Sequence, residues 1–79
     1  MERLHALDRS AIELARAEHE VALTNALIEL QRQLLEHLYQ SGEDITSAKL
    51  VFDSLVASLA CCVQRRHHLR LLVNSRQAA

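Results

Sequence analysis

The 79-residue sequence contains no proline and a single glycine, Gly42. Strands must be joined by turns at short intervals, and turns depend on these two residue types, so their scarcity excludes a fold with many strands. Aromatic residues are also rare, with one phenylalanine, one tyrosine and no tryptophan. Basic and acidic side chains nearly cancel, and a net charge of −1 supplies no overall field to attract nucleic acid or anionic lipid.

The sequence also lacks an export signal and a long apolar run. Charged residues such as Glu2, Arg3 and Arg9 interrupt the N-terminal segment and leave no apolar core for a secretory signal. The longest weakly polar run, Leu50–Val63, is broken by Asp53 and falls short of the ~20 residues that span a bilayer. We therefore predict a soluble, cytoplasmic protein without membrane contact.

Apolar residues make up 49% of the chain and recur at helical spacing on both sides of Gly42. Ser41 and Gly42 can end one helix, and Asp44 or Thr46 can cap the next, Asp44 by accepting from free N–H groups. The sequence thus predicts one all-α domain over residues 1–79, an antiparallel two-helix hairpin. We expect helices over about residues 3–40 and 45–75, with a turn over about residues 41–44.

One apolar stripe on each helix should form the core of the hairpin. A short turn makes the helices antiparallel, so residues that face each other should have numbers that sum to about 84. This register places Ile28 opposite Leu55 or Val56. The residues that we expect in the core are Leu14, Val21, Ile28, Leu35, Phe52, Leu55, Leu59 and Cys62.

More apolar residues are present than one such seam can hide. A domain of this size is also near the limit at which a single core is stabilising enough by itself. Both observations favour a homodimer in which two hairpins form a four-helix bundle. The residues that we expect at the dimer interface are Leu23, Leu27, Leu30, Leu34, Leu38, Val51, Val56 and Val63.

Polar residues interrupt the first stripe at Glu18, Asn25 and Arg32, seven residues apart, and the second stripe at Arg66. The register places Glu18 opposite Arg66. We predict a partly buried ion pair between them, inside the hairpin or at its dimer seam. This pair would select one alignment and one oligomeric state, because paired buried charges fix register more reliably than they add stability.

The segment LIELQRQLLEHLYQSGEDITSAKLVFDSLVASLACCVQRRHHL joins two helical patterns through a Gly-x-Asp turn, with Ala48, Phe52 and Leu59 spaced along the second. It resembles short, uncharacterised bacterial helical-hairpin proteins. The resemblance covers about half to two-thirds of the chain. It implies a helical hairpin and no assigned activity.

Two cysteines and two histidines lie close together in the segment ACCVQRRHHL. Cys61 and His68 share a helix face, but two turns separate them by about 10.5 Å, which is too far for one metal ion. Cys62 falls on the apolar stripe, whereas Cys61, near Arg65, is the better candidate for a reactive thiol. We predict no enzyme activity, metal or cofactor, and keep a thiol or metal sensor as an alternative.

An arginine-rich helix end is the remaining candidate site, with a possible basic patch at Arg65, Arg70 and Arg76. Acidic residues on the opposing helix dilute this charge, so we do not expect nucleic-acid binding, although a nucleic-acid accessory protein remains an alternative. The interpretation that we favour is a non-enzymatic, self-associating helical interaction or regulatory module of unknown pathway. Its protein partner, if any, cannot be identified from the sequence.

Overall fold

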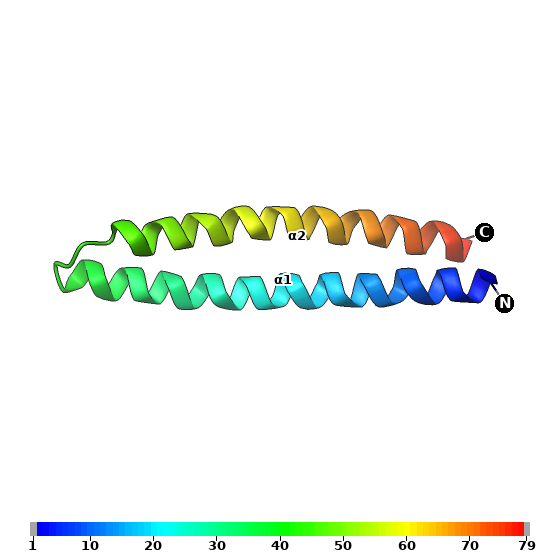
Figure 1. Ribbon diagram of the computed structural model, residues 1–79, viewed down its shortest axis with the longest axis horizontal. Coiled ribbons are helices and arrows are strands. Elements are labelled where there is room, and N and C mark those ends of the chain that lie inside the picture. Colours follow the sequence, from blue (N-terminus) through cyan, green and yellow to red (C-terminus); the bar gives the residue numbers. More distant parts are fainter. Residues whose placement is uncertain (1, 79) are drawn as a thin grey trace.

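The computed structural model describes the backbone of residues 2–78 and the side chains of residues 9–75. It contains two long helices, α1 (Glu2–Gln40) and α2 (Thr46–Ala78), which pack side by side in opposite directions (Figure 1). The described residues include no strand, so the predicted all-α hairpin is confirmed. The Cα radius of gyration is 17.8 Å, whereas a compact domain of this length would have about 12 Å. The hairpin is a rod, 60 Å long and 15 Å across.

Gly42 ends α1 in a left-handed conformation, with φ of 72°. Beyond it, the Glu43 N–H donates to the Leu38 carbonyl at 3.0 Å, and the Gly42 N–H donates to the Tyr39 carbonyl at 3.1 Å. These two bonds form a Schellman motif, which satisfies carbonyls left free at a helix end. The only glycine therefore stands where the backbone requires it.

Asp44 caps the start of α2. Its Oδ1 accepts hydrogen bonds from the Thr46 backbone N–H at 2.9 Å and from the Thr46 hydroxyl at 2.6 Å. Both bonds favour the ionised carboxylate and lower the pKa of Asp44 below its ordinary value. The cap and the Schellman motif together fix how the chain reverses direction.

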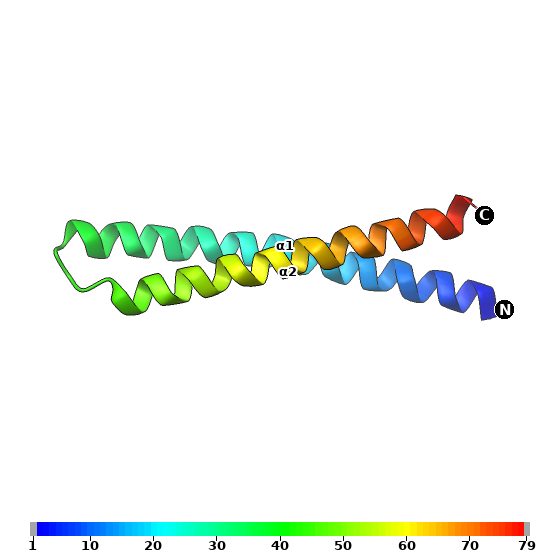
Figure 2. The ribbon, with the colours of Figure 1, turned by 90° about the horizontal axis from the view of Figure 1, so that it is seen from above.

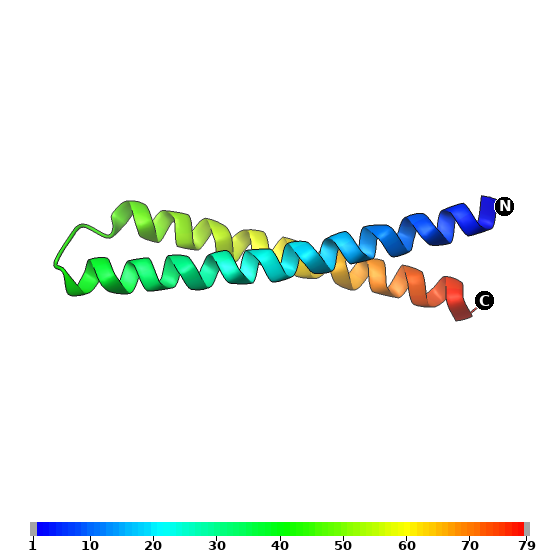
Figure 3. The same cartoon turned by 90° about the horizontal axis from the view of Figure 1, so that it is seen from below.

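The seam between the helices follows a strict alternation of three and four residues. Taken in order along the antiparallel pair, its positions face each other in layers whose residue numbers sum to 83, such as Leu14 with Leu69 and Val21 with Cys62. The helices cross at a shallow angle, as Figures 2 and 3 show from opposite sides. This is the geometry of an antiparallel coiled coil.

The register differs by one residue from the predicted sum of 84. In α1 the seam includes Ala17, Thr24 and Gln31, which lie one residue before the polar positions that we predicted on the stripe, Glu18, Asn25 and Arg32. Those three are exposed. Ala17, Thr24 and Gln31 are small or polar, so hydrophobicity alone did not identify them as seam positions. The Gln31 side chain donates across the seam to the Ala48 carbonyl at 2.9 Å.

Burial is concentrated in the half of the hairpin nearer the termini. The fully buried residues among those described are Ser10, Ala17, Val21, Leu69 and Val73. The eight predicted core residues all lie on the seam, but only Val21 is fully buried and the others are half-buried. Phe52, in the half nearer the turn, is therefore partly open to solvent.

Candidate interaction surface

Two ion pairs mark the two edges of the seam. Glu20 pairs with Arg65 at 3.4 Å, and Glu18 pairs with Arg70 at 3.1 Å. In a coiled coil, the two positions that flank the core on each helix lie on opposite sides of it. Glu20 and Glu18 occupy these two positions on α1, and we call the two sides the Glu20 edge and the Glu18 edge. Residues seven apart in the sequence occupy the same side of a helix. Each remaining outward-facing residue can therefore be assigned to the edge of the ion-pair residue from which it lies a multiple of seven away. All four side chains are about half exposed, and such pairs contribute little stability.

A band of large apolar side chains lies on the Glu20 edge, in the half nearer the turn. Leu27 and Leu34 repeat the position of Glu20, Leu23 and Leu30 flank them on the outer side of α1, and Val51 repeats the position of Arg65 on α2. We call these five residues the leucine face. Their exposed fractions range from 42% to 62%. A soluble monomer rarely exposes so many large apolar side chains together.

Small side chains lie beside the leucine face on α2. Ser58 repeats the position of Arg65, and Ser54 and Cys61 flank it on the outer side; all three are exposed. We call Ser54, Ser58 and Cys61 the small row. Apart from Val51, the Glu20 edge thus carries large residues on α1 and small residues on α2. The interface predicted from the sequence contained apolar residues alone and so did not include the small row.

The rest of the predicted dimer interface lies elsewhere. Val56 and Val63 repeat the position of Arg70 and so belong to the Glu18 edge, while Leu38 lies in the seam and is half-buried. These placements correct the predicted interface, which treated eight residues as one surface. The apolar strip is divided between opposite sides of the rod, and its larger part is the leucine face.

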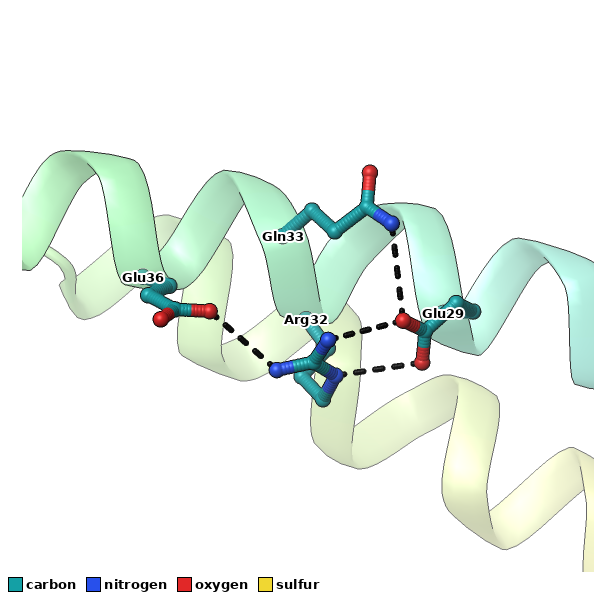
Figure 4. Close-up of polar contacts among 4 residues, drawn as sticks. All are labelled: Glu29, Arg32, Gln33 and Glu36. Carbon is teal, nitrogen blue, oxygen red and sulfur yellow. Dashed lines mark hydrogen bonds and ion pairs between the residues drawn. The ribbon is translucent and has the colours of Figure 1, made fainter.

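The other flank of α1 is polar at the level of the leucine face (Figure 4). Arg32 donates to both carboxylate oxygens of Glu29, at 2.7 and 3.1 Å, and to Glu36 at 3.2 Å. Gln33 adds a longer bond to Glu29 at 3.4 Å. The Arg32 hydrogen bonds lower the pKa of Glu29, and the same contact raises the pKa of Arg32. This network suits a surface that stays in water, unlike the leucine face.

The predicted ion pair between Glu18 and Arg66 is not formed within the hairpin. The register places Arg66 opposite Ala17, which is 1% exposed, while Glu18 lies on the edge and pairs with Arg70. The Arg66 Nε is buried and has no hydrogen-bond partner among the residues that the structure describes. Small Ala17 makes room for the Arg66 stem in the seam without neutralising its charge.

Two arginines of the arginine-rich end are paired with carboxylates. Arg65 and Arg70 each face a carboxylate of α1, and the side chain of Arg76 lies outside the described residues. Within residues 9–75, no three His, Cys, Asp or Glu side chains lie close enough together to hold a metal ion. A shallow depression near His19 is lined by residues of α1 alone. Cys61 and Cys62 are free thiols, the first exposed and the second half-buried in the seam.

By length and composition alone, the stretch Thr46–Ser75 of α2 is apolar enough to cross a membrane, since its most apolar window of 18 residues has a mean hydropathy of 1.5. None of its most apolar window is buried in the hairpin. The expected absence of membrane contact stays a prediction. Composition alone does not distinguish lipid from protein as the cover for such a surface, so the cytoplasmic location stays a prediction.

No family model matches the sequence, and no curated protein or solved structure matches it either. The resemblance to bacterial hairpin proteins therefore stays a prediction. Function must be argued from the surface of the hairpin, and above all from the leucine face.

Proposed function

We propose that this protein is a non-enzymatic, self-associating helical module, a cytoplasmic homodimer in which two hairpins form a four-helix bundle. It would act as an interaction or regulatory element through the surfaces that the bundle presents. The observation that carries this proposal is the leucine face, a group of large apolar side chains that the hairpin leaves in water.

The surface area of the single chain supports the proposal. The hairpin exposes 6179 Å², whereas a compact monomer of 8.9 kDa would expose about 4,800 Å². The excess, about 1,400 Å², is more than the ~800 Å² that each partner contributes to a typical stable interface. A second copy could therefore restore an ordinary ratio of surface to mass.

The interior of the single chain supports it as well. Four apolar residues are fully buried among those described, and no large side chain is below 2% exposed. Hydrophobic burial is the main favourable term in folding, so this hairpin alone has little to offset the conformational entropy that its two long helices lose on folding. Association would add the missing apolar burial.

The alternatives find less support in the geometry. A nucleic-acid accessory protein needs free cations, but Arg65 and Arg70 already face Glu20 and Glu18. A metal sensor needs convergent ligands, which residues 9–75 do not bring together. An enzyme needs a concave site, and the depression near His19 is shallow and lined by a single helix.

Sedimentation equilibrium over a range from low micromolar to submillimolar protein tests the proposal. We expect a mass of twice 8.9 kDa and a thermal midpoint that rises with concentration, because association stabilises the folded state by mass action. A fully helical monomer of 8.9 kDa at every concentration would refute self-association.

A further inference from the structure

The leucine face can be covered by a second copy in two ways. In a face-to-face pair of hairpins, a two-fold axis along the rod places α1 of one copy over α2 of the other, whereas an axis across the rod places α1 over α1. In the first arrangement every residue meets residues at its own level, that is, at the same distance along the rod. In the second, levels near the turn meet levels nearer the termini.

The sizes of the side chains favour the axis along the rod. Leu27 lies seven residues after Glu20, and Ser58 lies seven before Arg65, so the ion pair between Glu20 and Arg65 places Leu27 and Ser58 at one level. An axis along the rod therefore seats Leu27 of each copy on Ser58 of the other. An axis across the rod would press leucines against leucines and leave the small rows facing each other over a gap, and protein interiors do not tolerate such voids.

The charges favour the same axis. With the axis along the rod, Glu20 of one copy approaches Arg65 of the other, so that four charges alternate around the bundle at one level. With the axis across the rod, Glu20 would approach the level of His37 and Arg65 would lie near Ser47. The first arrangement adds opposite-charge contacts at the end of the apolar face and helps to fix the register.

We propose that two copies of this chain pair around a two-fold axis parallel to the rod, with the four leucines of the leucine face of each copy packed on the small row and Val51 of the other. The inference rests on the proposed self-association and adds which face is used, which helices meet and in which register. Val56, Val63 and the polar network around Arg32 stay on the outside of the resulting bundle.

A pair of tryptophan substitutions tests the face. Ser58 and Ala60 are both exposed in the single hairpin, so Ser58→Trp and Ala60→Trp should leave its helicity unchanged. Ser58→Trp fills the place that Leu27 of the second copy would occupy, and we expect its dimer dissociation constant to rise more than tenfold. Ala60→Trp, on the side of α2 away from the small row, should change it less than threefold.

The outcomes separate this inference from the proposed function. If the parent chain is a dimer and Ser58→Trp dimerises equally well, the face is wrong while self-association stands. If the parent chain is a monomer in solution, both fail. Sedimentation of the parent chain with phosphatidylcholine vesicles, instead of dimerisation, would identify lipid as the cover of the leucine face and overturn both.

Disulfide cross-linking tests the axis. In a Cys61→Ser, Cys62→Ala background, one chain carries Leu27→Cys and another carries Ser58→Cys. After mixing and mild oxidation, we expect the two different chains to join to each other, with little joining of like chains. Efficient joining of the Leu27→Cys chain to itself would instead show α1 over α1, and would overturn the axis while keeping the leucine face.

Discussion

The half of the hairpin near the termini and the half near the turn are held together differently. Near the termini, small Ser10 and Ala17 lie fully buried in the seam, and ion pairs from Glu18 and Glu20 join the two helices. Near the turn, the seam is only half-buried, and the ion pairs of Arg32 stay within α1. The first half closes on itself, whereas the second exposes the leucine face. The difference indicates where a second chain would contribute most.

The largest effect on the difference between the two halves is expected when charges are placed on the leucine face. We expect Leu27→Glu combined with Leu30→Glu to abolish the dimer. Complete burial of a leucine contributes about 1.5 to 3 kcal/mol, of which association supplies the share for the part still exposed, and a carboxylate in its place is costly to bury. Ile12→Glu is the matched control, since Ile12 is also an exposed apolar residue of α1 but lies in the half near the termini. Sedimentation equilibrium measures both. An equal loss of dimer from Leu27→Glu with Leu30→Glu and from Ile12→Glu would mean that the leucine face has no special part in dimerisation.

Truncations in the seam compare the two halves directly. Leu69→Ala, at a site that is 7% exposed, should lower the free energy of unfolding by about 3 kcal/mol. Phe52→Ala should cost about 2 kcal/mol, less than the 3 to 5 kcal/mol expected for a fully buried phenylalanine, because Phe52 is half-buried. Urea denaturation monitored by circular dichroism gives both values. A larger loss at Phe52 would place the stronger core near the turn.

Arg66 offers a change that should stabilise the half near the termini. Its buried Nε has no hydrogen-bond partner among the described residues, and an unsatisfied buried polar group costs about 1 to 3 kcal/mol. We expect Arg66→Leu to raise the free energy of unfolding by about 1 kcal/mol. Arg65→Leu is the control, since it removes only a half-exposed ion pair with Glu20. Destabilisation by Arg66→Leu would show that this guanidinium has a partner in solution.

The turn that joins the halves should respond more weakly. Gly42 has open space around it, so Gly42→Ala meets no clash, but its φ of 72° is unfavourable for any residue with a Cβ. We expect a loss of about 1 kcal/mol in the free energy of unfolding, typical of the left-handed region. Gly42→Asn should cost less, because asparagine tolerates this conformation. Unchanged stability in Gly42→Ala would mean that the turn rearranges freely.

The sequence predicted one set of seam positions in α1 and missed the other for a physical reason. Leu14, Val21, Ile28 and Leu35 are large and apolar, so their spacing of seven was visible. Ala17 and Thr24 lie between them and are small or polar, and hydrophobicity gave no reason to prefer them to their neighbours. The predicted register was therefore off by one, and Glu18 was assigned to the seam instead of its edge.

The second helix was easier to interpret, because both of its alternating positions are mostly apolar, from Ile45 to Val73. What the sequence could not supply was the edge on which each outward residue lies. Val51 and Val56 look equivalent in the sequence, but the ion pairs of Arg65 and Arg70 place them on opposite sides of the rod. That assignment depends on contacts between the helices, which pattern alone does not contain.

The smallest expected effect concerns pH and the half near the turn. The pKa of Glu29 is lowered by hydrogen bonds from Arg32, and the pKa of Asp44 is lowered by those from Thr46. A carboxyl group with a lower pKa in the folded state contributes stability that is complete above its unfolded pKa and is lost as the pH falls through its folded pKa. The thermal midpoint should therefore decline as the pH falls below about 4.5, the ordinary value for Glu29. Both groups are exposed, so the decline should be shallow.

Two neutral replacements separate these contributions. Glu29→Gln removes one titrating group of the half near the turn, and Asp44→Asn removes the other while keeping an oxygen that can cap α2. We expect the double variant to be slightly less stable than the parent at neutral pH and to lose less of its thermal midpoint between pH 6 and pH 3, roughly the range over which carboxyl groups titrate. Circular dichroism melts across this range provide the measurement. A profile parallel to that of the parent would mean that the acid response arises elsewhere, and the network around Arg32 would then be a feature of the surface without energetic weight.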